Sequence, residues 1–355
     1  MKILALDIGA GTEDILLFDS KKKNVENCIK LVLPTPSLIY AKKVTKVTIQ
    51  KENILLTGSV IGGGSLSYAL KNHIKAGLKV FVTRQAAFTI RNDLDQVREA
   101  GFEIIKEDIG KFDGEIIDLE EINIEQLRKF LTGFGETLSE VDYVAIAVQD
   151  HGISPKEITD RQFRIEKMEE FLKRNPKPEA LAFKEKDIPA YFLRMRSAAR
   201  DSKKHLPKAK VLLMDTAPAA IYGCLEDPFI RRIRTKLVIN VGNGHTWATI
   251  IDRNKIIGIM EHHTKILTPK KLEQLLIRFA DGKLTNQEVF SDGGHGAFFL
   301  RAPCGFLQIE KIVATGPNRS ILNKTNLQTY FAAPYGDVMM TGPAGLINAV
   351  KKIYK

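Results

Sequence analysis

The chain has 355 residues, of which 44% are hydrophobic and 27% are charged. These values are ordinary for a folded globular protein, and they exclude a disordered or fibrous one. The length exceeds the ~250–300 residues that one hydrophobic core supports, so it predicts two lobes. The longest apolar runs, such as residues 3–6 and 144–148, are far shorter than the ~20 residues that span a bilayer.

The net charge is +11, from 53 Lys and Arg against 42 Asp and Glu. Such a balance suits nucleic acid, an anionic membrane or phosphorylated ligands. The basic residues are scattered or form short runs, as at 21–23 and 231–234, and no aromatic-interleaved stripe stands out. The pattern therefore favours a lysine-rich solvated surface and no membrane partner, and nucleic acid is not indicated beyond the net charge. The N-terminal segment does not read as a signal peptide, so we expect a cytoplasmic protein.

Three cysteines, Cys28, Cys224 and Cys304, are far apart in the sequence. No CxxC or CxxxCxxC spacing occurs, which excludes a cysteine-only iron–sulfur cluster within one chain and a zinc ribbon. We expect reduced, buried thiols.

Apolar periodicity predicts strands and helices that follow one another along the chain. Before residue 230 the expected elements are a hairpin over 4–19, a strand over 29–33, further strand-like segments up to 56, a helix over 65–75, a strand over 79–82, a helix over 92–100, a strand over 102–106, a helix over 124–138, a strand over 141–148, helices over 160–174 and 188–199, a loop over 200–210, a strand over 211–214 and a helix over 217–225. After it they are a hairpin over 236–251, a strand over 256–261, a helix over 270–280 capped by Thr268, strands over 309–314 and 337–341, and a helix over 342–355. This order indicates an α/β class with mixed sheets.

An internal repeat is the most informative feature. Residues 4–19 and 237–252 align without a gap, pairing Asp7 with Asn240 and Asp19 with Asp252. Each copy is an apolar strand, a Gly-x-Gly turn and a second apolar strand, which is typical of a β-hairpin. We interpret the copies as two homologous lobes, over 1–230 and 231–341. The first would carry an insertion at about 50–140, and the helix over 342–355 would return to it.

An Asp at the end of a buried strand, followed by Gly-x-Gly-Thr, is typical of a phosphate-binding turn. Gly9 and Gly11 let backbone N–H groups approach an anion. Thr12 adds a hydroxyl donor, and Asp7 can hold a hydrated Mg²⁺. The alternative is a plain hairpin turn, which needs glycines anyway. The turn is neither a Walker A loop nor a Rossmann fingerprint.

With its second copy, the sequence resembles the actin-like ATPase superfamily, which includes actin, the 70-kDa heat-shock chaperones, hexokinase and the acetate and sugar kinases. Residues 7–12 resemble its first phosphate loop, 240–246 its second, 218–223 its first connecting helix, 312–320 its adenosine loop and 342–349 its second connecting helix. The resemblance implies two duplicated ribonuclease-H-like lobes with mixed sheets around a nucleotide cleft, and ATP and Mg²⁺ as cofactors. In the second lobe it implies nucleotide contacts from Gly242, Asn243, Gly244, His245, Thr246, Gly316, Asn318 and Arg319.

Two positions depart from the superfamily pattern. Asn240 stands where an acidic residue usually helps to place metal or water, so we expect slow hydrolysis or a loop that mainly binds. The adenosine turn has Gly316 and Pro317 instead of a glycine pair, which makes the adenine assignment less secure than the phosphate one.

In this superfamily the residue that activates water or substrate commonly follows the fourth strand of the first lobe. Here that strand ends in Gln149, Asp150, His151 and Gly152. By resemblance, Gln149 orients water and Asp150 acts as a general base. The alternative is that Asp150 caps a turn before Gly152.

Three further features stay open. The glycine-rich loop 291–296 holds an Asp and a His, and it is either a substrate loop or a surface turn. Adjacent His262 and His263 lack the helical spacing of a metal pair, and His245 is the histidine that we most expect near a phosphate. Glycines 62–64 before a helix either hold an anion or form a flexible turn.

Three functions compete: a phosphotransferase acting on an unknown small molecule, a nucleotide-driven reactivase or chaperone-like ATPase acting on a protein partner, and a non-catalytic nucleotide sensor. Lobe closure around ATP would serve the first two. We expect specificity to lie in the segment 50–140, but nothing in it names a substrate. The sequence also does not indicate an oligomeric state.

Overall fold

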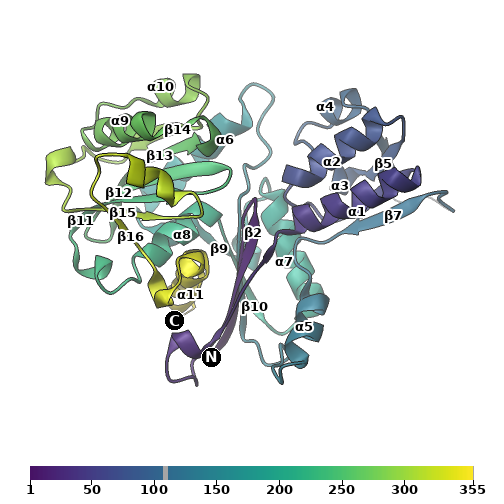
Figure 1. Ribbon diagram of the computed structural model, residues 1–355, viewed down its shortest axis with the longest axis horizontal. Helices are drawn as coiled ribbons and strands as arrows, with labels where there is room; N and C mark the ends of the chain where they lie inside the picture. Colours follow the sequence, from purple (N-terminus) through teal and green to yellow (C-terminus); the bar gives the residue numbers. More distant parts are fainter. Residues whose placement is uncertain (107–110, 355) are drawn as a thin grey trace.

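The computed structural model describes residues 1–106 and 111–354. Its two large sheets (Figure 1) share the order of five strands, and each has one extra edge strand, β9 in the first and β14 in the second. The first sheet runs β3 (Ile29–Pro34), β2 (Thr12–Asp19), β1 (Lys2–Ile8), β8 (Tyr143–Val148), β10 (Lys210–Met214), β9 (Ala182–Lys184). The second runs β14 (Gly296–Phe299), β13 (Lys255–His263), β12 (His245–Asp252), β11 (Thr235–Val241), β15 (Lys311–Thr315), β16 (Thr329–Phe331).

Strand direction in the two sheets follows the same rule. In each, the first hairpin strand pairs antiparallel with the second and parallel with the strand that follows the crossover, β8 or β15. The third strand, β3 or β13, then extends the hairpin antiparallel. This shared order confirms the predicted α/β fold class of two duplicated ribonuclease-H-like lobes with mixed sheets.

The hairpin repeat extends to its register. Asp7 pairs with Asp14 across β1 and β2, and Asn240 pairs with Trp247 across β11 and β12. Each tip closes with the same backbone hydrogen bond, which Gly9 N–H donates to Thr12 O at 2.9 Å in one copy and Gly242 N–H to His245 O at 2.9 Å in the other.

The segment between β3 and β8 forms a small α/β unit of its own. Its parallel sheet has the order β6 (Glu103–Ile105), β5 (Val80–Thr83), β4 (Ile54–Gly58), β7 (Glu115–Leu119). The helices of this unit are α1 (Pro36–Gln50), α2 (Gly64–Lys75), α3 (Arg84–Ala87) and α4 (Leu94–Glu99), on the right of Figure 1. Part of the predicted insertion, residues 107–110, lies outside the described residues.

Buried polar contacts join this unit to α7 (Leu193–His205) of the first lobe. Ser59 donates its hydroxyl to Asp201 Oδ1 at 2.6 Å, and Arg194 binds both carboxylate oxygens of Glu121, at 2.7 and 3.0 Å. A charged pair with two parallel hydrogen bonds fixes orientation as well as position.

Helices α8 (Thr216–Cys224) and α11 (Thr341–Ile353) cross at very short range. A Cβ atom at Gly223 would lie 1.7 Å from Thr341 O, and one at Gly345 would lie 1.9 Å from Ala219 O. These distances explain the small residues expected at the connecting helices, because no side chain fits between the two backbones. The remaining helices are α5 (Ile124–Thr132), α6 (Asp160–Arg174), α9 (Pro269–Ala280) and α10 (Asn286–Ser291).

Three predicted elements were wrong. The strand-like segments expected after residue 36 form α1, because Tyr40, Val44 and Val47 have helical spacing and face the core. The strand expected over 337–341 is a short 3₁₀ turn, η9 (Val338–Met340), which Asp337 caps by accepting a hydrogen bond from Met339 N–H. The expected helix over 188–199 begins later, at Leu193, and its last turn occupies part of the expected loop over 200–210. The final helix ends at Ile353, and Lys355 lies outside the described residues.

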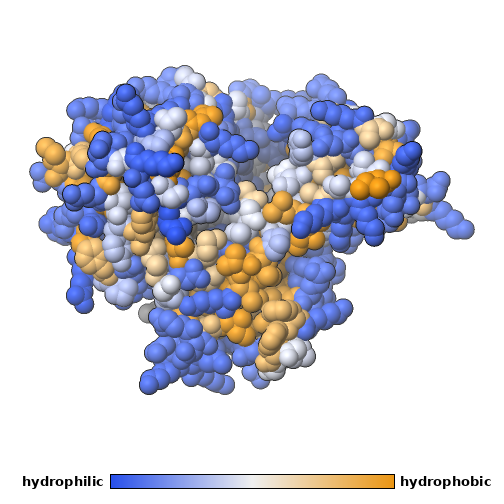
Figure 2. All heavy atoms as spheres, in the orientation of Figure 1, coloured by the Kyte–Doolittle hydropathy of each residue, from blue (hydrophilic) through white to orange (hydrophobic). Residues whose placement is uncertain are grey.

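Figure 2 shows the surface hollowed between the second lobe and the small unit. Within residues 1–106 and 111–354, no helix is long and apolar enough to cross a membrane.

Candidate functional site

A cavity of about 430 Å³ lies between the two lobes and the small α/β unit. Both hairpin tips, the end of β8 and glycines 62–64 line it, as do Gly316 and Pro317. The two tips also approach each other, because a Cβ atom at Gly11 would lie 2.4 Å from Asn243 Nδ2. The duplicated hairpins therefore enclose the cavity from opposite lobes.

Two carboxylates, each with one buried oxygen that lacks a partner, lie opposite one another on the first hairpin. Asp7 Oδ1 and Asp14 Oδ1 are buried and have no hydrogen-bond partner, and both residues line the cavity. Burial, then the neighbouring Asp14, raises the pKa of Asp7 well above its usual value. Burial also raises the pKa of Asp14 to about 7. Orphaned, mutually repelling carboxylates of this kind fit a divalent cation that prefers oxygen ligands.

Asp150 combines a place in the cavity wall with capping contacts. Its Oδ1 accepts a hydrogen bond from Gly152 N–H at 2.9 Å, and its Oδ2 accepts one from Met195 N–H at 3.0 Å. Burial raises the pKa of its carboxyl to about 6, although these backbone bonds oppose the shift. The structure thus shows the predicted turn-capping contact and adds a second one, at the start of α7.

The neighbouring Gln149 spans the two lobes. Its side chain lies 3.4 Å from Glu261 Oε1 on β13, and its carbonyl accepts a hydrogen bond from Arg194 at 2.9 Å. Glu261 in turn belongs to a buried ionic network around Arg164 of α6.

Arg164 links the lobes through two carboxylates. It binds Asp215, at the end of β10, through two hydrogen bonds of 2.6 and 2.9 Å, and Glu261 through one of 2.8 Å. All three side chains are at most 5% exposed. Burial alone would raise the pKa of Glu261, but the Arg164 guanidinium holds it well below its usual value. The network carries one positive and two negative charges, so it is a negative wall beside the cavity.

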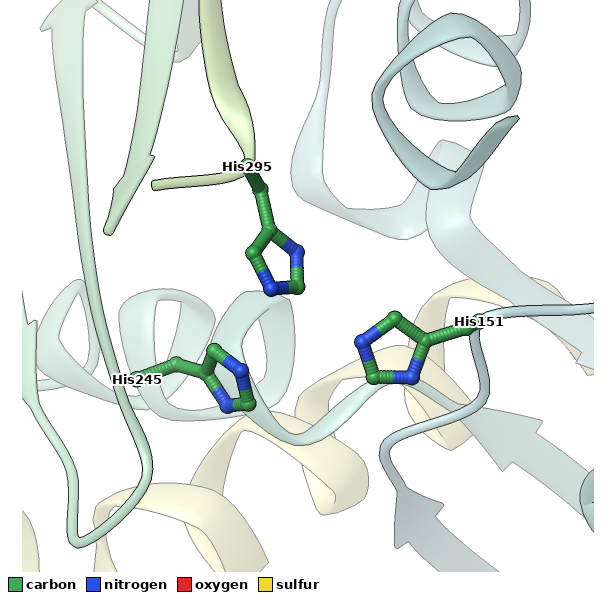
Figure 3. A group of neighbouring side chains, drawn as sticks. All are labelled: His151, His245 and His295. Atoms are coloured by element: carbon green, nitrogen blue, oxygen red, sulfur yellow. The ribbon is translucent and has the colours of Figure 1, made fainter. Parts of the chain in front are cut away.

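Histidines cluster against this wall. His245 and His295 ring centroids are 4.7 Å apart, His263 and His295 are 4.9 Å apart, and His151 and His295 are 5.1 Å apart. Figure 3 shows His151, His245 and His295 turned toward one another. Burial lowers the pKa of His245 to about 3 and that of His151 well below its usual value, so both rings are neutral.

The other predicted contacts divide into two groups. Gly9, Thr12, Gly242, Asn243 and Gly244 line the cavity. Asn318 instead donates to Gly242 O at 3.1 Å, and Arg319 donates to Gly316 O at 3.0 Å, so both support the loop that carries Gly316. Thr246 is fully buried, with its hydroxyl 3.0 Å from that of Thr264.

Sequence reasoning missed Asp14, Arg164, Arg194 and Glu261. Only Asp14 had a readable signal, since hairpin register places it opposite Asp7. In the loop 291–296, which the sequence left open as a substrate loop or a surface turn, His295 is 1% exposed and faces the histidine cluster. His262 points elsewhere, with its Nε2 3.0 Å from Asp292 Oδ2.

In the actin-like ATPase superfamily, two ribonuclease-H-like lobes each direct a glycine-rich hairpin toward a shared cavity. This protein has that fold. Within that class, the chain belongs to the family described as "Putative pyruvate format-lyase activating enzyme (DUF1786)", whose model matches residues 61–321. No curated protein matches the sequence.

Several solved structures are similar at low identity. One, from Listeria monocytogenes, is described as "Lmo2764 protein, a putative N-acetylmannosamine kinase"; it is 9% identical, with all of both chains covered and a TM-score of 0.40. The ethanolamine utilization protein EutJ of Carboxydothermus hydrogenoformans is 8% identical, with 98% of this chain and 89% of that chain covered and a TM-score of 0.29. An exopolyphosphatase from Cytophaga hutchinsonii is 11% identical, with 89% and 66% covered and a TM-score of 0.29.

Proposed function

We propose that the cavity binds Mg²⁺–ATP between the two hairpins and supports slow hydrolysis or phosphoryl transfer. One observation carries the proposal: two hairpins of identical register, one from each lobe, bring their tips to a single cavity that also holds the unpaired carboxylate of Asp7. Backbone N–H groups at glycine turns suit phosphate oxygens because no Cβ blocks their approach.

Asp7 and Asp14 are the residues that would hold Mg²⁺ against the phosphates, since both have an orphaned oxygen at the cavity wall. Mg²⁺ supplies charge neutralisation of the phosphates when bound. Gln149 would orient the attacking group, and Asp150, whose pKa lies at about 6, would accept its proton. The resemblance assigns the adenosine side to the loop of Gly316.

A second candidate is a nucleotide-driven change in a protein partner, which the family description of an activating enzyme favours. Cys28 and Cys224 are buried and Cys304 is exposed. Across the described part of the chain, no cysteine belongs to a group with metal-ligand spacing. We therefore propose that any activation of a partner is driven by lobe closure around nucleotide, and not by an iron–sulfur cluster.

The first test is calorimetric titration of ATP and ADP with Mg²⁺ into the wild type, Asp7→Ala and Asp95→Ala, with phosphate release followed in parallel. Asp95 is a matched control because it lies exposed on α4 and pairs only with residues near it. We expect Asp7→Ala to weaken binding at least tenfold, about 1.4 kcal/mol, and Asp95→Ala to bind as the wild type does.

Absence of nucleotide binding in the wild type would overturn the proposal. Binding without phosphate release would identify a sensor. A rate of phosphate release that increases when a small molecule is added would identify a kinase. A rate that increases only when a protein partner is added would identify an activating ATPase.

A further inference from the structure

Three histidines from distant parts of the sequence meet at the wall of the cavity. His151 follows β8 of the first lobe, His245 begins β12, and His295 precedes β14. One ring nitrogen of each lies within 4.8 Å of the others, and the three rings face a common centre (Figure 3). A tetrahedral metal ion with bonds of ~2.0–2.1 Å holds its nitrogens ~3.3 Å apart. Small side-chain rotations therefore close the group around an ion.

Hydrogen bonding around His295 leaves a conflict that a cation resolves. His263 Nδ1 lies 2.7 Å from Gly293 O, which can only accept, so that nitrogen carries the proton and Nε2 carries the lone pair. His263 Nε2 then faces His295 Nε2 at 3.3 Å. The other nitrogen of His295, Nδ1, is buried, lacks a hydrogen bond and lies 3.4 Å from Glu261 Oε2.

With one ring proton, His295 has a single donor for these two positions, and either a second proton or a metal ion can supply what is missing. A proton on Nε2 turns the Nδ1 lone pair toward the Glu261 carboxylate, which repels it. A proton on Nδ1 points at Glu261 and leaves two lone pairs facing each other at Nε2. The second arrangement becomes favourable when a metal ion takes the Nε2 lone pair, and a carboxylate then orients a ligating histidine, as is usual in metal sites.

We propose that His151, His245 and His295 bind a divalent transition-metal ion of the Zn²⁺ class, with Glu261 as the residue that orients His295. Imidazole nitrogens select such ions over Mg²⁺, which prefers oxygen. The carboxylate pair Asp7 and Asp14 and the histidine group thus suit different cations in one cavity. The Glu261 carboxylate, 3.4 Å from His295 Nδ1, favours a cation as well.

The site has two consequences for the cavity. His151 and His245 line the cavity, so the position that three protein ligands leave open faces it and takes water or an oxygen atom of a bound ligand. The ligands also come from both lobes, so an ion joins β8 of one lobe to β12 and β14 of the other. This inference requires only the imidazoles and does not rest on nucleotide binding.

The test uses the full chain, stripped of metal with a chelator and free of nucleotide. Co²⁺ alone is titrated and followed by visible absorption, and Zn²⁺ is titrated by calorimetry. We expect one ion per chain and displacement of Co²⁺ by Zn²⁺. Glu261→Gln should lower Zn²⁺ affinity by ~10–100-fold, and His151→Ala, His245→Ala or His295→Ala should lower it further.

His205→Ala is the matched control, since His205 lies on α7 and pairs with Glu120 and Glu125; it should keep wild-type affinity. Thermal unfolding of each metal-free variant checks its fold, and His245→Asn is the second variant should His295→Ala not fold. Zn²⁺ should raise the Tm of the wild type and of His205→Ala most, that of Glu261→Gln less, and that of the three histidine variants least.

Two results would overturn the proposal. One is a wild type that binds Co²⁺ and Zn²⁺ no more tightly than the three alanine variants. The other is a wild type that binds neither ion and shows His295 doubly protonated by NMR, which would mean that a proton holds the cluster together. Mg²⁺–ATP binding to the same metal-free samples is scored separately, so failure of the metal site and failure of the nucleotide site are distinct results.

Discussion

Asp7 was predicted from its place before a Gly-x-Gly turn, whereas its partner Asp14 was not. The difference is physical, because a turn motif is contiguous in sequence, but a cross-strand neighbour appears only when the register of the hairpin is applied. Hairpin register does not predict residues such as Glu261 and Arg164. Their roles depend on contacts between lobes that no local pattern encodes.

A single substitution at Asp150 distinguishes a role as general base from a role as turn cap. We expect Asp150→Asn to lower turnover per bound nucleotide by ~10²–10⁴-fold, because the amide cannot accept a proton from the attacking group. In the wild type, the rate should rise with pH through about 6, where this carboxyl ionises. Phosphate release at saturating Mg²⁺–ATP, measured well below the Tm, gives both results.

The same change should also reduce the free energy of unfolding by ~1–3 kcal/mol, since an amide nitrogen would face one of the two backbone N–H donors. A variant that loses only this stability, and keeps its turnover and its pH profile, would show that Asp150 is a cap and not a base.

Among elements, the strands of both hairpins, α6 and α9 were predicted closely, because each has clear periodicity and recognisable end signals. Helix α1 was not, because its β-branched residues Val44, Thr45, Val47 and Thr48 favour strands locally. The packing of Tyr40, Val44 and Val47 into the core of the small unit decided the outcome. The resemblance identified residues 218–223 and 342–349 as connecting helices, and the close crossing of α8 and α11 gives the reason for their small residues.

We expect Gly345→Ala to destabilise the protein by several kcal/mol, because the new methyl would lie 1.9 Å from Ala219 O and the two helices would have to separate. Gly244→Ala is the matched control, since a Cβ there has nothing within 4 Å. Urea unfolding followed by circular dichroism measures both. Equal stability of the two variants would show that the crossing yields without cost.

At the scale of the whole molecule, the duplicated topology followed from one aligned repeat, yet the small α/β unit between β3 and β8 did not. An insertion has no internal copy to align with. Its strand β7 does alternate, since Ile116 and Asp118 are exposed while Ile117 and Leu119 are buried, but the sequence analysis did not use this signal. Of the cavity wall that the unit supplies, the sequence indicated only glycines 62–64.

Stability should depend on pH through buried acids. Burial raises the pKa of Glu13 from 4.5 to about 8, so between these values the folded state binds more protons than the unfolded state, and stability falls as pH rises. His151 and His245 act in the opposite direction, but only up to about pH 6.5, where unfolded histidines lose their proton. Between pH 6.5 and 8 the acids dominate.

We expect the ligand-free protein to lose about 2 kcal/mol of unfolding free energy to Glu13 over that window. Denaturant titrations at pH 6.5, 7.25 and 8 measure the slope, and Glu13→Gln should reduce it by the Glu13 share, while Asp7 and Asp14 keep contributing in the same direction. A slope that the substitution leaves unchanged would assign the pH dependence to other groups.

The contact between Asp7 and α11 has a consequence for synthesis. A Cβ atom at Gly342 would lie 1.8 Å from Asp7 Oδ2, so a carboxylate made among the first residues packs against a helix made more than 330 residues later. A nascent chain that has left the ribosome only as far as α10 carries both hairpin tips but lacks the helix that packs against Asp7. Such chains expose the groove that α11 fills, which makes them targets for chaperones. We would then expect ligand binding only by chains that have been translated at least through residue 353.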